Sequence, residues 1–236
     1  MKKIIYLTLT FIIMLSLVAC DNNTKNSNTN NDNSNQITDK DNTETNKQTY
    51  TGEITEDVLR SHPETSVSAF KYEWSNDYEG IRITDYLGND DIVVIPEEIE
   101  GQPVVEVAGY TFANDSQVRG VVLPNTVIEI SELFINNSKV EMVIAEGLQK
   151  IGYAAFHNCG ALREVILGDN VKYIGISAFA VCSNLERLSI PVTVTNMTKN
   201  EQHSAFLGCS KLTIYGEKGS YIESVANEQG IPFVAE

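Results

Sequence analysis

Few residues of this 236-residue chain have the types and spacing that catalysis requires. The three histidines are His62, His157 and His203, and no zinc-protease, nucleophile-elbow, phosphate-loop or dinucleotide-binding motif occurs. The acid pairs Asp90–Asp91 and Glu97–Glu98 are more typical of solvated loops than of a general acid and base. Because no nucleophile, base and orienting group can be assembled, the sequence predicts no enzyme, no metal and no cofactor.

The four cysteines fall into two groups. Cys20 ends an apolar N-terminal run, whereas Cys159, Cys182 and Cys209 recur further along the chain. If that recurrence reflects a repeat, the three thiols stack a few ångströms apart. They would then form either a disulfide, which is permitted outside the cell, or a buried ladder of small apolar side chains. We favour the ladder because the count is odd, and no CxxC spacing supports a metal.

The N-terminus has the layout of an export signal. Lys2–Lys3 precede an apolar run of 15 residues, Ile4–Val18, which is short for a transmembrane helix. The run ends in Leu17-Val18-Ala19-Cys20, which resembles the lipobox of bacterial lipoproteins. This resemblance implies that residues 1–19 are a lipoprotein signal peptide and that Cys20 carries a lipid. Two or more acyl chains on Cys20 would anchor the protein stably to the extracellular face of the bacterial cell membrane.

A tether follows the lipidated cysteine. Residues 21–49 are almost all Asn, Thr, Ser, Asp, Lys and Gln, and Ile37 is their only large apolar residue. Such a composition cannot bury enough apolar area to offset the entropy of ordering, so we expect residues 20–49 to be a disordered spacer. As a random coil it would span about 30 Å, and about 100 Å when fully extended.

The charge excludes some classes of partner. The chain has a net charge of −15, and residues 1–19 hold two lysines and no acid, so their removal gives −17. Binding to nucleic acid needs a basic surface, and so does docking on an anionic membrane through protein charge. We therefore expect no nucleic-acid partner, and membrane contact only through the lipid on Cys20.

A repeat occupies the body of the chain. A phenylalanine recurs at steps of 22, 22, 23 and 27 residues, at Phe112, Phe134, Phe156, Phe179 and Phe206. An aliphatic residue follows each of them after six residues. The residues nine positions after each phenylalanine are Val121, Val143, Val165, Leu188 and Tyr215. A Leu-x-x-Leu-x-Leu pattern of this kind places one short strand in each coil with alternate residues inward, and the phenylalanine fills the opposite turn.

The repeat unit resembles that of BspA-like leucine-rich-repeat surface proteins of bacteria. The third copy shows the motif best, from Ile151-Gly152 through Ala155-Phe156 to Cys159, Leu162 and Val165. The resemblance implies a leucine-rich-repeat solenoid over residues 91–215, mainly β, with one short parallel strand per coil of about 22–27 residues. Asp115 and Asn137 replace the cysteine in two copies, and residues 192–205 carry a four-residue expansion.

Both ends of the stack need covers. Residues 50–90 are expected to form the N-terminal cap, with a short helix that starts at Thr55 and a strand that contains Phe70 and Trp74. Residues 216–236 are expected to form a C-terminal capping helix and tail, with Ser220 as the N-cap and Gly230 as the stop. These short capping helices complete the predicted fold.

The outward positions of the strands form the candidate binding face. Seven residues after each phenylalanine come charges of alternating sign, which could pair up the stack: Arg119, Glu141, Arg163 and Glu186. Ten residues after it come three apolar residues: Val122, Ile144 and Ile166. This apolar strip is either a sticky surface for a partner or is covered by side chains from the edge.

The sequence therefore favours an acidic, lipid-anchored protein of the cell surface that binds a ligand. The resemblance implies adhesion or ligand binding through the strand face, with a protein or a wall polymer as the partner. The alternative is a structural spacer or scaffold of the cell envelope with no specific ligand. An enzyme is disfavoured.

Overall fold

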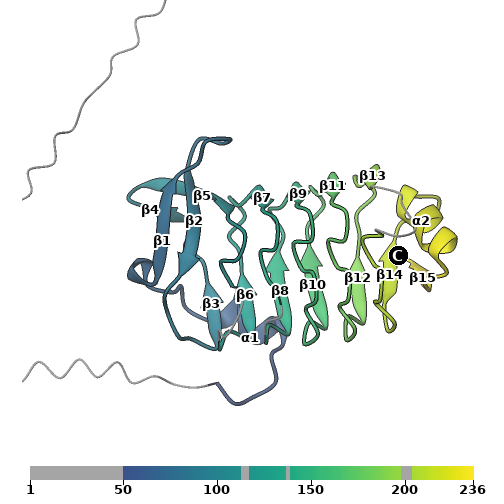
Figure 1. The fold of residues 1–236 in the computed structure, drawn as a ribbon, viewed down its shortest axis with the longest axis horizontal. Coiled ribbons are helices and arrows are strands. Elements are labelled where there is room, and N and C mark those ends of the chain that lie inside the picture. Colours follow the sequence, from purple (N-terminus) through teal and green to yellow (C-terminus); the bar gives the residue numbers. More distant parts are fainter. Residues whose placement is uncertain (1–49, 113–116, 137–138, 198–203) are drawn as a thin grey trace, which may run out of the picture. The chain divides into compact units, whose positions relative to one another are not determined.

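Successive coils of the chain stack side by side into a mainly β solenoid (Figure 1). The computed structural model describes residues 50–112, 117–136, 139–197 and 204–236. The signal peptide, Cys20, the tether, Asp115 and Asn137 lie outside the described residues, as does part of the expansion at 192–205. No helix in the described part of the chain is long and apolar enough to cross a membrane.

Sheet B contains the strand that the repeat predicts. Each strand of this sheet runs parallel to the strands beside it. The strands are β3 (Ile92–Val94), β6 (Gly120–Val122), β8 (Met142–Ala145), β10 (Glu164–Leu167), β12 (Arg187–Ser189), β14 (Thr213–Gly216) and β15 (Phe233–Ala235). The residues nine positions after each phenylalanine pair with one another from strand to strand, as the repeat predicts. They are Val121, Val143, Val165 and Leu188, and all four side chains point inward and are buried. The fold that the sequence predicted is thus confirmed.

Sheet A adds a second strand to each coil that the sequence did not predict. Its strands are β1 (Phe70–Trp74), β2 (Ile81–Tyr86), β5 (Gln102–Val107), β7 (Glu129–Ile130), β9 (Lys150–Ile151), β11 (Tyr173–Ile174) and β13 (Asn196–Met197), and β4 (Glu98–Ile99) pairs with β5. Five of these strands, β4, β7, β9, β11 and β13, have only two residues, so alternation of apolar and polar residues cannot reveal them.

A left-handed residue turns the chain after each of the sheet A strands β5, β7, β9 and β11. It lies three residues beyond the last inward residue of the strand, at Tyr110, Leu133, Ala154 and Ser177, with φ between 51° and 63°. None of the four is glycine, although this region costs a non-glycine residue roughly 1–2 kcal/mol. The turn recurs because it directs the chain from sheet A toward the phenylalanine.

A column of aromatic rings runs through the core. The five phenylalanines of the repeat stack with centroid distances of 5.0 to 5.9 Å. Tyr86 and Phe70 extend the column into the N-terminal cap at 5.5 and 5.6 Å. Phe112, Phe134, Phe156 and Phe179 have no exposed surface, so each ring is covered by those of the coils beside it.

The three repeat cysteines form a second buried column. Cys159, Cys182 and Cys209 are free thiols, and each donates a hydrogen bond to a carbonyl of the preceding coil, for example Cys182 Sγ to the Phe156 oxygen at 2.9 Å. The neighbouring thiol and burial raise the pKa of Cys182 and of Cys209. These thiols therefore serve as small core side chains, which agrees with the ladder.

The C-terminal end of the stack is closed by α2 (Tyr221–Gln229). Ser220 caps the helix by accepting a hydrogen bond from the Glu223 N–H, and Gly230 ends it in the left-handed region with φ of 67°. Ile222, Val225 and Ala226 are buried against the core. Beyond the helix, β15 adds a last strand to sheet B that the sequence did not predict.

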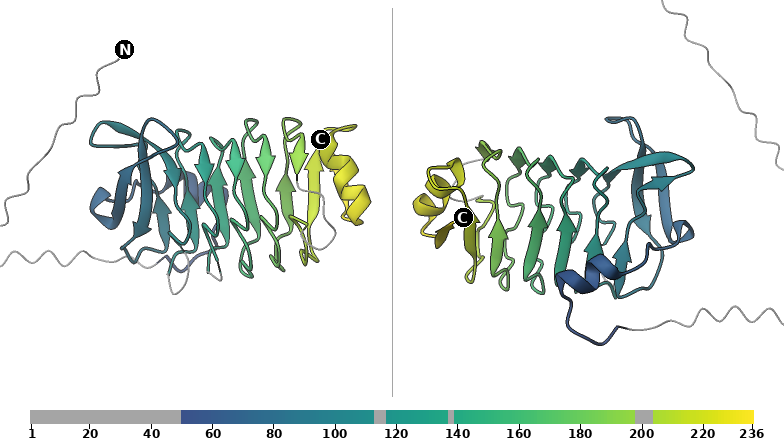
Figure 2. Two further views of the ribbon diagram at one scale, coloured as in Figure 1. Left: turned by 45° about the horizontal axis from the view of Figure 1, so that its top comes forward. Right: turned by 180° about the vertical axis from the view of Figure 1, so that it is seen from behind.

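The N-terminal helix is present but does not lie where we expected it. Thr55 caps α1 (Glu56–Ser61) by accepting a hydrogen bond from the Val58 N–H. Instead of closing the end of the stack, α1 lies across sheet B beside β6 and β8 (Figure 2, right). We call residues 50–62 the strap. The single-turn helix η1 (Val67–Ala69) leads from the strap region into β1.

Removing one ring from the middle of the column tests its contribution. Phe156→Ala should lower the free energy of unfolding by about 3–5 kcal/mol, because the ring is fully buried between Phe134 and Phe179. Urea denaturation followed by circular dichroism measures the loss. Phe156→Leu serves as the control and should lose less, and equal losses for the two variants would contradict a role for ring packing.

Gly120 is the point at which the strap packs against sheet B. A Cβ there would lie 2.4 Å from Leu59 Cδ2, so Gly120→Val should displace the strap and speed tryptic cleavage after Arg60. In Gly160→Val the new side chain meets open space and should leave the cleavage rate unchanged. Equal cleavage rates in the two variants would show that the glycine is not required.

The thiol column should resist alkylation. Because all three thiols are buried, Cys159, Cys182 and Cys209 should stay unlabelled by iodoacetamide in the native protein, and the raised pKa of Cys182 and of Cys209 further reduces the thiolate available there. All three should react once the protein is denatured without reductant, as mass spectrometry would show. Failure to react after denaturation would instead indicate a disulfide.

Candidate functional site

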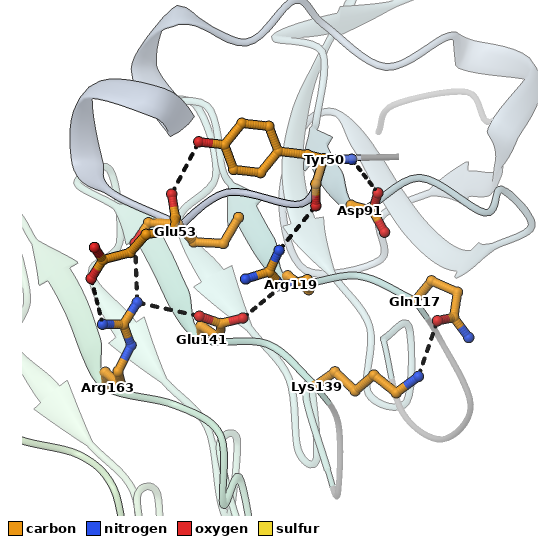
Figure 3. A network of polar contacts seen from close by, with 9 residues as sticks. Tyr50, Glu53, Asp91, Gln117, Arg119, Lys139, Glu141 and Arg163 are labelled. Atoms are coloured by element: carbon orange, nitrogen blue, oxygen red, sulfur yellow. Dashed lines mark hydrogen bonds and ion pairs between the residues drawn. The ribbon is translucent and has the colours of Figure 1, made fainter. Parts of the chain in front are cut away.

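The charged row of the predicted face forms an ion-pair ladder in its first three coils. Glu141 forms ion pairs with two arginines: its Oε1 lies 2.6 Å from Arg119 Nε, and its Oε2 lies 3.2 Å from Arg163 Nη2 (Figure 3). Stacking at the parallel-strand spacing brings these side chains together, as the alternation of signs predicted. One carboxylate thus joins three neighbouring coils.

The ladder does not extend to Glu186, contrary to our expectation. Arg163 turns toward the strap instead, where Nη1 lies 3.1 Å from Glu53 Oε1 and Nη2 donates to the Ile54 carbonyl at 3.2 Å. Glu186 is exposed and has no cation within ion-pair distance among the described residues. The sequence could not show this, because the competing acceptors lie 110 and 109 residues away.

Polar contacts also fix the start of the strap. The Tyr50 N–H donates to Asp91 Oδ2 at 2.7 Å, and its carbonyl accepts from Arg119 Nη1 at 3.0 Å (Figure 3). Further along, Arg60 makes two hydrogen bonds to Glu146, at 2.8 and 3.2 Å. That pairing holds the pKa of Glu146 below its usual range.

The strap covers the centre of the apolar strip. Ile144 is only 2% exposed, and it packs with the strap residues Ile54 and Leu59 in a small core on the outer side of sheet B. Val122 and Ile166 are half-buried at its margin. Of the two alternatives for the apolar strip, cover by other side chains of the chain therefore holds at Ile144, while Val122 and Ile166 keep part of their surface exposed.

The strap does not cover the outer side of sheet B at β12 and β14. The last coil has one residue fewer before its strand, so Ile214 takes the inward position that the spacing assigned to Tyr215. Tyr215 points outward instead, and the Arg187 guanidinium lies 3.8 Å from the centre of its ring. Arg187 Nη2 also bonds Glu236 Oε1 at 2.5 Å. Ser189 completes this outer surface between Ile166 and Tyr215 in strand order.

All four charged residues of the predicted face line one hollow of about 600 Å³ beside sheet B. Its other lining residues are Lys139, Ala161, Asn184 and Lys211. Lys139 donates to Gln117 at 3.0 Å and Lys211 to Asn184 at 2.7 Å, and both amines are exposed. Sequence reasoning missed the two lysines, although both lie five residues after a repeat phenylalanine.

The hollow offers ammonium, guanidinium, amide and carboxylate groups on a rigid support. Such a set can form several directed hydrogen bonds to a polar ligand that has both acidic and hydroxyl groups. In the described part of the chain no group of three or more His, Cys, Asp or Glu residues is arranged to hold a metal ion. The arrangement is suited to recognition.

Comparison with known proteins agrees with the repeat. A family model described as "BspA type Leucine rich repeat region" matches residues 101–225 in six copies. The solved structure of a T. pallidum leucine-rich-repeat protein is similar with a TM-score of 0.57 and 31% identity, over 65% of this chain and 71% of that one. No curated protein matched.

A second solved structure supports the fold alone. It is a leucine-rich-repeat protein from Bacteroides ovatus, with a TM-score of 0.52 and 24% identity over 65% of this chain. The match spans 47% of that protein, so this chain covers less than half of it. The repeat model, the 31% identical structure and the stacked phenylalanines together identify the chain as a member of the BspA-type leucine-rich-repeat family.

Proposed function

We propose that this protein is a lipid-anchored binding protein of the bacterial cell surface that attaches to a protein or a wall polymer through the exposed part of sheet B. The observation that carries the proposal is the hollow lined by Arg119, Glu141, Arg163 and Glu186, with Lys139 and Lys211 as exposed amines. The surface continues from Ile166, which is half-buried at the margin of the strap, onto Ser189 and Tyr215.

The strand face suits this role because it is rigid. Parallel pairing fixes each outward side chain relative to the next coil, so a ligand meets groups that are already in place. Arg and Tyr are enriched among the residues that contribute most to interfaces, and Arg187 stacked on Tyr215 is such a pair. The proposed role is binding without catalysis, since the hollow holds no nucleophile paired with a base.

The location rests on the N-terminus. The basic start, the apolar run and the box before Cys20 support export and lipidation, and the polar stretch up to residue 49 supports a spacer between lipid and solenoid. A surface protein of this design would meet partners beyond the membrane.

Binding measurements with charge-reversed lysines test the face. Lys139→Glu with Lys211→Glu should weaken binding of the full-length protein to purified cell-wall sacculi, or to immobilised matrix proteins, by roughly tenfold or more. Ile166→Glu should weaken it as well. Lys218→Glu is the control, because Lys218 is exposed and lies outside the hollow.

Two results would count against the proposed role. Equal loss in the Lys218→Glu control would show that only net charge matters. If neither sacculi nor matrix proteins retain the wild-type protein, a spacer role in the envelope becomes the better explanation.

Replacing the lipidated cysteine tests the location. Cys20→Ser should shift the protein from the detergent phase to the aqueous phase on Triton X-114 partitioning, because the acyl chains are lost. Cys182→Ser should stay in the detergent phase, since Cys182 lies in the core. Detergent-phase partitioning of Cys20→Ser would contradict anchoring through this residue.

A further inference from the structure

The two ends of the solenoid are finished differently. At the C-terminal end α2 packs three buried side chains onto the last coil. At the other end, the outer edge of β3 in sheet B is met by Thr65, whose N–H donates to the Val94 carbonyl at 2.9 Å. In sheet A, β1 is the terminal strand and its backbone pairs with β2 alone among the described strands, while the turn between β4 and β5 reaches only the Tyr72 side chain, whose hydroxyl donates to Glu100 Oε1 at 3.1 Å (Figure 1).

The backbone of β1 presents groups that can extend the sheet. The Ser75 N–H donates to the Gly80 carbonyl at 2.9 Å, so Ser75 faces its partner strand. Alternation along an antiparallel pair then places the N–H and C=O groups of Tyr72 and Trp74 on the outer edge. An extended chain could add to this edge by main-chain hydrogen bonds.

Trp74 makes this edge unusual. It is the single tryptophan of the chain and is 55% exposed. Its cross-strand neighbour is the core residue Ile81, so the indole lies on the core side of the sheet, where the stack of coils ends. In the inner coils, core side chains are covered by the coil on either side. An added strand would cover Trp74 in the same way.

Charge selects the kind of chain that fits. Residues 50–100 contain 13 acids and three Lys or Arg residues, which accounts for −10 of the net charge of −15. Near β1 the two cations are already paired, Lys71 with Asp85 and Arg82 with Glu73. Asp77, Glu79 and Glu100 are exposed and have no cation within ion-pair distance among the described residues. A second copy of this chain would bring the same acids and be repelled.

We infer that the outer edge of β1 is a docking site for an extended, lysine- or arginine-rich segment of a partner protein. Its backbone would pair with Tyr72 and Trp74, an apolar part would cover the indole, and its cations would meet the nearby carboxylates that have no cation partner. This site lies in the N-terminal cap and is separate from the hollow beside sheet B, so the inference stands or fails independently of the proposed function.

Trp74 reports on its own site. Full-length protein is titrated with a short peptide of alternating lysine and threonine, and tryptophan emission is recorded. A shift of the emission to shorter wavelength is expected, with affinity that falls as salt is added. A control peptide of alternating glutamate and threonine should cause no shift of the emission. A second control peptide, of alternating lysine and proline, has the same charge as the lysine–threonine peptide but only half its backbone N–H groups. It should bind at least about tenfold more weakly than the lysine–threonine peptide.

Variants identify the residues, with a fluorescently labelled lysine–threonine peptide and anisotropy as the readout. Trp74→Ala should weaken binding roughly tenfold, and Glu79→Gln should weaken it more than Asp169→Asn, which removes the same charge from a distant turn. Circular dichroism checks that each variant is folded. Equal binding of the lysine–proline peptide, unchanged Trp74 emission, or equal effects of Glu79→Gln and Asp169→Asn would overturn the inference.

Discussion

Contact between the aromatic rings of neighbouring coils is the interaction on which the solenoid depends. Phe134, Phe156 and Phe179 have no exposed surface, and each owes its burial to rings on both sides. A single coil has too few residues to shield such a ring, so it cannot fold alone. Ring separations of 5.0 to 5.9 Å fit the spacing of parallel strands, so ring contact and strand pairing in both sheets can be satisfied together.

The same stacking creates the candidate site from residues that are distant in sequence. Arg119, Glu141 and Arg163 meet because they occupy one position in three consecutive coils. The strap competes for this row: it draws Arg163 toward Glu53 and buries Ile144 under Ile54 and Leu59. One face is thereby divided into a covered part near the N-terminus and an exposed part further along.

The sequence predicted the features that follow the phenylalanine spacing and the two capping helices, and it missed the two-residue strands of sheet A and the path of the strap. The spacing of the phenylalanines was sufficient to predict the coils, the inward residues of sheet B and the charged row. The short helix capped by Thr55 was predicted as well, but its one buried residue, Leu59, could not show which surface the helix would cover. A single missing residue after Leu212 displaced Tyr215 from the core to the surface, and fixed spacing does not detect such a change.

The junctions between coils have a consequence for how the molecule can vary. β6, β8 and β10 pair in unbroken parallel register, so each interior coil presents nearly the same surface to the coil before it and the coil after it. A whole unit can thus be duplicated or deleted in the gene without new boundaries having to evolve. The length of the rod, and with it the reach of its far tip, is an adjustable property that selection can change in steps of one coil.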